Sequence, residues 1–528
     1  MIERQSGIVG RSALVRPDLA AGAFLFVVYA ITLARGVTFW DAGEFLAAVH
    51  SLGIPHPPGT PVFILTARAW AEIVGPLTGF TIAVNAFSAA CTAASFAIVA
   101  NLFWRWTGNT LLAFCAAITA GLTSTIWLNA TETEVYAASL LLAILIVWVG
   151  NRAGETTEMR WLVLGAYLVG LGWALHLTAL LGVPCALVLA WPALRVARAR
   201  TWVTGFILAA IGATPVLFML LRAHHDPTIN QGDPQSWTAL WDALERHQYD
   251  VAPLWPRRAP LWLQFANIFE YADWQFALGL APDPPPTIAR TGITVAYALL
   301  GAYGAMRHRA LDRRSFRAWC VMLVVTSIGV VLYLNLHAGA SFGAGVLPAN
   351  AVHEARDRDY FFVLAFTCWA TWAGTGAVAL ARQYITGQRR AAVVAVCIAA
   401  LPLVLNWGVI RFERHDEQLR AARGARTLLE SVPRNGIFIA VGDNDTYPLW
   451  YMQEVERVRR DVIVVTAPLL PAEWARAELQ RRHQLLDGAD VTVWRGLPQT
   501  LRDLRAHAAA QHRPVVVSPD ARSFPLPR

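Results

Sequence analysis

Long apolar segments alternate with short polar ones through the first four-fifths of the chain, and this pattern predicts a bundle of membrane-spanning helices. Eleven runs are long and apolar enough for that role. They are residues 18–35, 80–104, 110–128, 134–150, 161–176, 177–194, 202–222, 289–306, 318–336, 361–381 and 391–410. Residues 61–75 are apolar but short and contain Arg68 and Glu72, so we expect this segment to lie in the membrane interface or to enter it partway.

The pattern changes after residue 411 to short alternating runs that are typical of a small α/β domain. Residues 434–465 predict a strand, a loop, a helix and a second strand, and HRPVVVS near the end predicts another strand. We therefore expect a multi-pass membrane domain over 1–411 and an α/β domain over 412–528. The membrane domain carries three long loops on its outer face, residues 36–79, 223–288 and 337–360.

Composition agrees with a membrane protein, because 56% of the residues are hydrophobic and only 15% are charged, against roughly 25% charged in soluble domains. The net charge of +8 comes from arginine alone, since the chain has no lysine. This excludes a Schiff-base lysine and a P-loop lysine. The six cysteines lie in apolar segments without a CxxC pair, so we infer neither a zinc site nor a disulfide framework.

The distribution of arginine predicts an orientation with the N-terminus in the cytoplasm. Seventeen arginines then fall on inner segments and four on the short outer loops, as the positive-inside rule requires. This alternation of inner and outer loops requires residues 161–194 to form a hairpin that turns near His176. It also places the α/β domain outside. The first apolar run lacks an A-x-A-like cleavage site, so we interpret it as an anchor.

The first outer loop carries the strongest candidates for chemistry. Asp41 and Glu44 are three residues apart, so both can point to one side of a short helix. His56 opens the His-Pro-Pro-Gly sequence, which ends a helix and fixes a rigid turn. The alternative is local: Asp41 caps the helix and Glu44 completes a capping box. Ionisable groups beside lipid are costly and usually functional, which favours a role in the site.

A second group stands at the outer end of the third long run, where Glu132, Glu134 and Tyr136 fall within five residues. An acidic residue in the first turn of a helix also complements the helix dipole, which is the alternative for one of them. Two carboxylates beside lipid favour substrate binding.

A third group lies in the long outer loop and includes Asn230, Gln248 and Tyr249. Polar turns and aromatic residues in a loop are equally compatible with simple packing.

The fourth group, residues 353–360, directly precedes a predicted spanning helix and contains Arg356, Arg358, Asp359 and Tyr360. Two arginines on the outer side, where arginine is rare, are an exception to the positive-inside distribution. Paired guanidinium groups grip phosphate oxygens, so they suggest an anionic head group as ligand. The alternative is a ladder of Arg–Asp salt bridges that holds the loop.

A fifth group, Asp443 and Asp445, follows a predicted strand at its carboxyl end, where α/β sheets place ligands. The alternative is an Asx turn that caps the next helix. His353, Glu354 and Asp357 are candidates for a divalent cation site, but no spacing among them is diagnostic. We therefore favour neither a metal nor a cofactor.

The motifs D-x-G-E-F (41–45) and H-P-P-G (56–59), on an outer loop after the first helix, resemble the glycosyltransferase-C superfamily. More closely they resemble the family long catalogued as a domain of unknown function, which includes the animal multi-pass protein O-mannosyltransferase. The same order of motifs continues with T-E-V-Y-A, N-Q-G-D-P, R-x-Q-Y, R-D-R-D-Y-F and G-D-N-D-T-Y-P-L-W-Y-M-Q-E-V. The resemblance extends over residues 18–470, but Thr60 stands where relatives more often have tyrosine.

The resemblance implies an integral membrane enzyme that moves a sugar from a polyprenyl phosphate to an acceptor on the outer face. It implies that Asp41 acts as base and that Glu44 is the second carboxylate of the motif. The assignment of Arg356 and Arg358 to the donor phosphate rests on their charge. We expect an inverting transfer of mannose or another hexose to a protein, lipid or glycan, with the lipid-linked sugar as co-substrate and no nucleic acid as partner.

Two other classes of protein remain alternatives. A transporter or flippase of lipid-linked saccharides also uses carboxylates and arginines, but it places them near the bilayer midplane beside broken helices. A non-enzymatic scaffold leaves the charged outer loops unexplained. The plasma membrane of a bacterium is the location that we expect.

Overall fold

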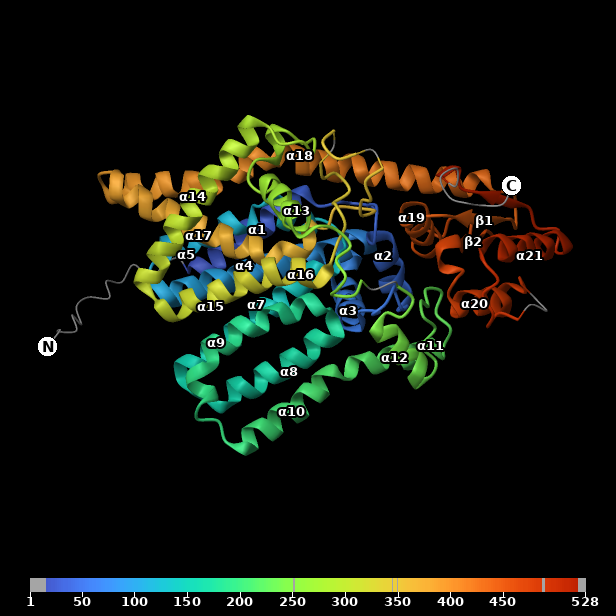
Figure 1. Cartoon of the computed structure of the whole chain (residues 1–528), viewed down its shortest axis with the longest axis horizontal. Coiled ribbons are helices and arrows are strands. Elements are labelled where there is room, and N and C mark those ends of the chain that lie inside the picture. The colour runs from blue at the N-terminus through green and yellow to red at the C-terminus, as the bar shows by residue number, and fades with distance from the viewer. Residues whose placement is uncertain (1–15, 250–251, 344, 349, 487–489, 521–528) are drawn as a thin grey trace.

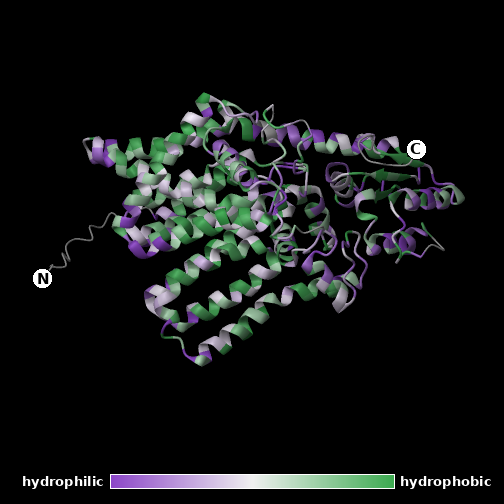
Figure 2. Cartoon of the chain, in the orientation of Figure 1, coloured by the Kyte–Doolittle hydropathy of each residue, from purple (hydrophilic) through white to green (hydrophobic). Residues whose placement is uncertain are grey.

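The computed structural model describes residues 16–249, 252–343, 345–348, 350–486 and 490–520 of the chain. Most helices lie side by side in a bundle, and a small sheet with its own helices sits at one end (Figure 1). The bundle is mostly hydrophobic along its helices, while hydrophilic segments gather in the loops between the bundle and the sheet (Figure 2). The bundle is therefore the membrane domain that the apolar pattern predicts.

Seven helical segments are long and apolar enough to cross a membrane. They are α4 (Phe80–Thr107), α7 (Val135–Thr156), Leu177–Leu194, Ala199–Ala223, Arg313–Leu334, Asp359–Tyr384 and α18 (Gln388–Ser431). An eighth results if α5 (Thr110–Gly121) and α6 (Ser124–Ala130), which meet at 75°, form one span.

The predicted number of eleven spans is not confirmed. Two of the predicted runs form shorter apolar helices, α1 (Pro17–Thr32) and α8 (Met159–Leu175). A third forms α14 (Ile288–Leu311), which has Arg290 in its first turn and a basic last turn. The predicted break near His176 is present, because α8 ends at Leu175 and His176 has an extended backbone.

The remaining helices join or extend these segments. They are α2 (Ala42–Ser51), α3 (Pro61–Thr78), η1 (Leu177–Gly182), α9 (Val183–Leu194), α10 (Ala199–Ala213), η2 (Thr214–Val216), α11 (Leu217–Ala223), α12 (Trp237–Glu245), α13 (Leu261–Trp274), η3 (Leu278–Leu280), α15 (Arg313–Val324), the π-helix η4 (Val325–Gly329), α16 (Val330–Leu334), η5 (Asp359–Phe362) and α17 (Val363–Tyr384).

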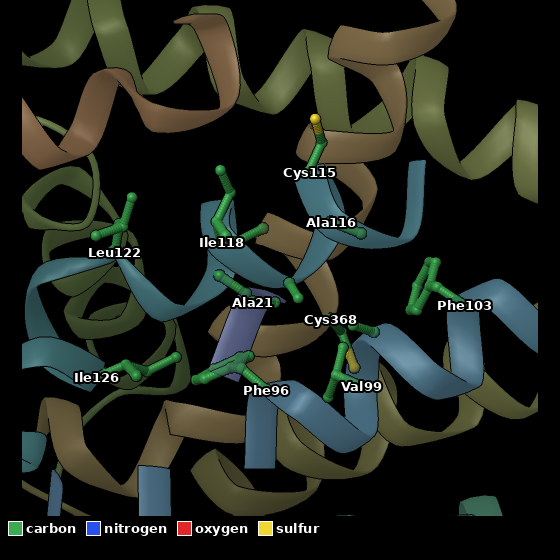
Figure 3. Close-up of a cluster of buried hydrophobic side chains, with 14 of the residues drawn as sticks. Ala21, Phe96, Val99, Phe103, Cys115, Ala116, Ile118, Leu122, Ile126 and Cys368 are labelled. Carbon is green, nitrogen blue, oxygen red and sulfur yellow. The ribbon is translucent and has the colours of Figure 1, made fainter. Parts of the chain in front are cut away.

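Small residues let the central helices approach closely. A Cβ atom added to Gly374 of α17 would lie 2.4 Å from the carbonyl oxygen of Cys115 in α5. One added to Gly376 would lie 2.1 Å from that of Leu300 in α14. Lipid tails are as apolar as a protein core, so close packing of this kind holds spanning helices together. The core is filled by side chains such as Phe96, Phe103, Ile118 and Cys368 (Figure 3).

The C-terminal part contains the predicted sheet. Three parallel strands, β1 (Ile437–Ala440), β2 (Ile463–Thr466) and β3 (Val515–Val517), are ordered β2-β1-β3. The connections include α19 (Asp443–Glu454), η6 (Ala467–Leu469), α20 (Glu473–His483) and α21 (Leu497–Ala510). The predicted strand, helix and strand over 434–465 are therefore confirmed. The boundary that composition predicts, between residues 411 and 412, falls inside α18, which runs from the bundle to the sheet (Figure 1).

The glycine of the D-x-G-E-F motif holds this end of the molecule together. A Cβ atom on Gly43 would lie 2.5 Å from the carbonyl oxygen of Tyr447 and 2.9 Å from the nitrogen of Pro448. Gly43 therefore lets α2 pack directly against the backbone of α19. This contact joins the first outer loop, which carries Asp41, to the C-terminal domain.

We expect Gly43→Ala to destabilise the protein by about 1–3 kcal/mol, because backbone atoms cannot move aside as a flexible side chain can. The measurement is the unfolding temperature in detergent, together with the rate at which trypsin releases the C-terminal domain. Gly424→Ala on α18 is the matched control, since nothing lies within 4 Å of its added Cβ atom. An unchanged unfolding temperature for Gly43→Ala would contradict this account.

Candidate active site

Asp41 is paired with an arginine from the far end of the membrane domain. It stands at the start of α2, yet its side chain makes no capping hydrogen bond, so the capping interpretation is wrong for this residue. Its Oδ2 atom instead accepts a hydrogen bond from Nη2 of Arg356 at 2.7 Å. Burial raises the pKa of Asp41, but the charges of Arg356 and His56 outweigh burial and hold it below its usual value. Asp41 is therefore ionised at neutral pH.

Arg356 and Arg358 converge on one tyrosine. Nε of Arg356 donates to the hydroxyl oxygen of Tyr360 at 2.9 Å, and Nη1 of Arg358 donates to the same oxygen at 2.6 Å. The Arg356 guanidinium also lies over the ring of Trp40, 5.2 Å from its centroid. Nε of Arg358 is buried without a hydrogen-bond partner in the described part of the chain. Because Arg356 bonds to Asp41, 315 residues away, it is not part of a local salt-bridge ladder.

Glu44 is fully buried and holds His56 in place. Its Oε1 atom accepts the backbone N–H of His56 at 2.7 Å, and its Oε2 atom lies 2.5 Å from Nδ1 of the imidazole. Nε2 of Gln231 also donates to Oε1. Burial lowers the pKa of His56, but the charge of Glu44 outweighs it and raises the pKa to about 9. His56 is thus an imidazolium at neutral pH, and Glu44 is no capping-box residue.

The two glutamates before α7 have different surroundings. Glu132 accepts hydrogen bonds from Nη2 of Arg414 at 2.6 Å and from Oγ1 of Thr38 at 2.7 Å. Glu134 is buried, and its Oε2 atom has no hydrogen-bond partner among the described residues. Burial and the nearby charge of Asp41 raise the pKa of Glu134 well above its usual value. Both effects favour the protonated form of the Glu134 carboxyl.

One cavity of about 590 Å³ opens beside Asp41. Its polar wall contains four arginines, two carboxylates and the imidazoles of His56 and His176, and its apolar wall belongs to the segments that run into the membrane. The polar residues include Asp41, His56, Arg246, Tyr249, Arg258, Glu354, Arg356 and Arg358, and the apolar ones include Leu177, Leu181, Val325, Val330, Leu334 and Phe361. Tyr136 and Tyr360 also line it, with ring centroids 4.6 Å apart. This combination suits a ligand with an anionic head and an apolar tail.

A second cavity of about 530 Å³ lies on the other side of the arginine. It shares Arg356 and Tyr360 with the first cavity, so these two residues form part of the wall between them. Its lining is rich in carboxylates and tryptophans: Trp40, Glu132, Glu134, Trp274, Asp357, Asp359 and Glu417.

The structure places the other candidates around these cavities. Asp359 lines the second cavity and accepts a hydrogen bond from Thr125 at 2.5 Å. Asn230 donates to Asp233 within its own turn, and Gln248 accepts from Trp474 of α20 at 3.2 Å. Asp445 accepts the backbone N–H of Gly442 at 2.7 Å, so it caps α19 from the first turn of the helix through a capping-box bond and not through an Asx turn. Asp443 is exposed in the same turn.

His353, Glu354 and Asp357 each bond to a separate neighbour. Nδ1 of His353 lies 2.7 Å from the carbonyl oxygen of Gly339, and Glu354 accepts the N–H of His337. In the parts of the chain that the structure describes, no group of three or more His, Cys, Asp or Glu residues is placed to hold a metal ion.

Sequence reasoning did not select Gln231, Arg246 or Arg258 as site residues, although the first two stand in the third candidate group. Gln231 and Arg246 belong to motifs that carry the resemblance, N-Q-G-D-P and R-x-Q-Y, and this was the signal that could have found them. Arg258 lies in no motif, and only the folded loop brings it to the cavity.

Comparisons with known proteins agree with the motifs. Residues 41–196 match a family model described as the protein O-mannosyl-transferase TMEM260 N-terminal domain, and residues 421–493 match TMEM260-associated domain 2. The mouse protein O-mannosyl-transferase TMEM260 is 22% identical over 500 residues, which are 89% of this chain and 65% of the mouse protein. The Dictyostelium discoideum protein of that description is 22% identical over 143 residues, 26% of this chain and 17% of that protein. This chain thus spans less than two thirds of either relative.

A solved structure has the same fold. ArnT from Cupriavidus metallidurans bound to undecaprenyl phosphate superposes with a TM-score of 0.51 and 10% identity, covering 84% of this chain and 89% of ArnT. Together these matches confirm the resemblance to the glycosyltransferase-C superfamily and to the protein O-mannosyltransferases.

The Glu44–His56 pair predicts how stability depends on pH. The folded pKa of His56, about 9, exceeds its ordinary value of 6.5. The free energy that the Glu44–His56 pair contributes to folding is therefore fully present below pH 6.5, and it is lost as the pH rises through 9. We expect the stability of the wild type relative to Glu44→Gln to fall by on the order of 3 kcal/mol over this range.

Thermal unfolding in detergent between pH 6 and pH 10 measures this difference. Glu72→Gln is the control, because Glu72 is exposed and pairs only with Arg68 on its own helix among the described contacts. Its profile should run parallel to that of the wild type. A constant difference between the wild type and Glu44→Gln across the range would exclude the pairing.

Proposed function

We propose that this protein is a membrane glycosyltransferase that moves mannose or another hexose from a polyprenyl-phosphate donor to an acceptor hydroxyl on the outer face of the membrane, with inversion. The observation that carries the proposal is the ion pair of Asp41 and Arg356 at a cavity with arginines on one wall and apolar spanning segments on the other. The description of the curated relatives as protein O-mannosyl-transferases supports it. The ArnT structure, bound to undecaprenyl phosphate, supports a lipid-linked donor.

The first cavity is suited to the donor. Arg246, Arg258, Arg356 and Arg358 offer positive charge to the phosphate, and a guanidinium binds phosphate oxygens through paired hydrogen bonds. The apolar wall lies on segments that run into the bilayer, so a polyprenyl chain can leave the cavity without crossing water. A volume of about 590 Å³ lies within the usual range for small-molecule sites, roughly 300–1,000 Å³.

Asp41 is suited to act as the base. It is ionised at neutral pH, so it can accept the proton of the acceptor hydroxyl as that oxygen bonds to the anomeric carbon. The bond between the anomeric carbon and the phosphate oxygen breaks, and the lipid phosphate leaves with the bonding electrons. Arg356 touches Asp41 before the reaction and, with Arg358 and protonated His56, stabilises the charge that grows on the leaving phosphate.

The position of the charged groups favours transfer over transport. Asp41 lies outside the spanning segments, Glu134 directly precedes α7, and the span of α17 begins at Asp359. A transporter of lipid-linked saccharides needs such groups near the middle of its spans. Here they gather at helix ends, around the two cavities.

We expect Asp41→Asn to lower the rate of sugar transfer about 10²- to 10⁴-fold, which is the usual contribution of a general base. The assay measures the release of polyprenyl phosphate from a radiolabelled polyprenyl-phosphate mannose by purified protein in detergent, where no ion gradient exists. Asp416→Asn is the control, since Asp416 is an exposed carboxylate that pairs with Arg420 on the same helix. Full activity of Asp41→Asn would refute the role of base.

Arg358→Gln should raise the KM for the donor about 10- to 100-fold, because a hydrogen bond to a charged group contributes about 1.5–3 kcal/mol. Initial rates at varied donor concentration measure this effect. Arg423→Gln, on the exposed face of α18, should leave the KM unchanged. A donor KM equal in Arg358→Gln and the wild type would remove Arg358 from the phosphate site.

A further inference from the structure

A groove in the C-terminal domain runs along the outer edge of its sheet. The groove has a volume of about 250 Å³ and is lined by all four residues of β2, by α19 and α20, and by the 228–231 loop. Trp450 of α19 and Trp474 of α20 are among its lining residues. Because β2 is an outer strand of the sheet, the floor of this groove is an open strand edge.

The register of the sheet shows which backbone groups face the groove. Ile463 pairs with Ile437, and the N–H of Ile463 donates to the carbonyl oxygen of Gly436. Backbone bonding alternates along a strand, so Ile463 and Val465 bond to β1, while Val464 directs its N–H and C=O groups outward and Thr466 its N–H group. The C=O group of Thr466 belongs to the first turn of η6, for which Thr466 is the N-cap. Within the described ranges, no backbone group bonds to this outer edge.

Three further polar atoms around the groove lack partners. They are Oδ1 of Asn230, Oε1 of Gln231 and Oγ1 of Thr466, all buried and without a hydrogen bond among the described residues. Buried polar groups are normally satisfied, so these atoms mark a place where hydrogen-bond donors are expected. An unpaired strand edge that lies beside such atoms is suited to an extended polypeptide, which supplies main-chain N–H groups at regular intervals.

Two residues that line the groove, and one further residue of α19, contact residues in or next to the two cavities and the Asp41 loop. Gln231 lines the groove and donates to Glu44. Trp474 lines the groove and donates to Gln248, the neighbour of Tyr249 in the first cavity. Asn444 in the first turn of α19 accepts the backbone N–H of Trp40, which lines the second cavity.

We propose that an extended segment of the acceptor protein binds as an added strand on the outer edge of β2. This inference rests on the proposed function and assigns a binding site for its acceptor outside the two cavities. The bound segment places a serine or threonine a few residues away at Asp41, because an extended chain advances about 3.3 Å per residue. The tryptophans contact side chains of the segment, and the outward groups of Val464 and Thr466 bond to its backbone.

The test compares long and short acceptors. Purified full-length protein receives polyprenyl-phosphate mannose with either a library of 12-residue peptides that contain one serine among random β-branched and polar residues, or a capped Ala-Ser-Ala tripeptide that is too short to span groove and Asp41. We expect the wild type to have a KM for the long peptides at least tenfold below that for the tripeptide. Val464→Pro removes an outward N–H and should abolish this difference, while the rate with the tripeptide stays the same.

Val517→Pro is the matched control, because Val517 also faces outward, on the opposite edge of the sheet, and proline is tolerated on an edge strand. It should retain the preference for long peptides. The proposal is overturned if Val464→Pro retains that preference, if it slows both acceptors equally, or if the wild type prefers the tripeptide or transfers to neither peptide. A wild-type protein that leaves the donor unconsumed with every acceptor, lipid and glycan included, would instead refute the proposed function.

Discussion

The ion pair between Asp41 and Arg356 is the interaction on which the rest of the site depends. It joins the loop after the first helix to the loop before α17, so it brings together segments from opposite ends of the membrane domain. A partly buried pair must recover the cost of removing both charges from water, and here Tyr360 and Trp40 contact the guanidinium and help to do so. Burial raises the pKa of Asp41, but the charges of Arg356 and His56 outweigh it and hold this pKa below its usual value. The same contact holds an arginine on the wall shared by the two cavities.

The motif around Asp41 also has a structural role. Gly43 permits α19 to pack on α2 without a side chain between them, and Glu44 anchors both the His56 turn and Gln231. D-x-G-E-F therefore carries one residue that we propose as the base, one against which the C-terminal domain packs and one that positions the imidazole. This division explains why the capping interpretation, which considers only the start of a helix, is insufficient for Asp41 and Glu44.

The apolar pattern located the long helices of the bundle, and the alternating pattern located the sheet, but neither predicted α12, α13, α20 or α21. The apolar pattern also gave too many spans, because α1 and α8 have only 16 and 17 residues and α14 carries basic residues at both ends. Arg290 opens α14 and is fully buried, where Asp273 and the carbonyl oxygens of residues 281 and 283–285 surround it. The sequence also could not predict which residues of the site contact one another. No local pattern indicates that Gln231 meets Glu44 across 187 residues, because this contact exists only once two loops have docked.

Glu132 and Glu134 show how far a motif can be interpreted without its surroundings. Both belong to one short acidic sequence, which gives no reason to expect different roles for the two glutamates. In the folded protein Arg414 and Thr38 both donate hydrogen bonds to the carboxylate of Glu132. This carboxylate therefore links α18 to the segment before α7. The Oε2 atom of Glu134 has no hydrogen-bond partner among the described residues, and burial together with the charge of Asp41 raises the pKa of Glu134 well above its usual value. Neighbouring carboxyl groups with separated pKa values divide their roles between acid and base. The pKa of Asp41 is lowered where that of Glu134 is raised, and this separation supports the proposal that Asp41 is the group that accepts the proton.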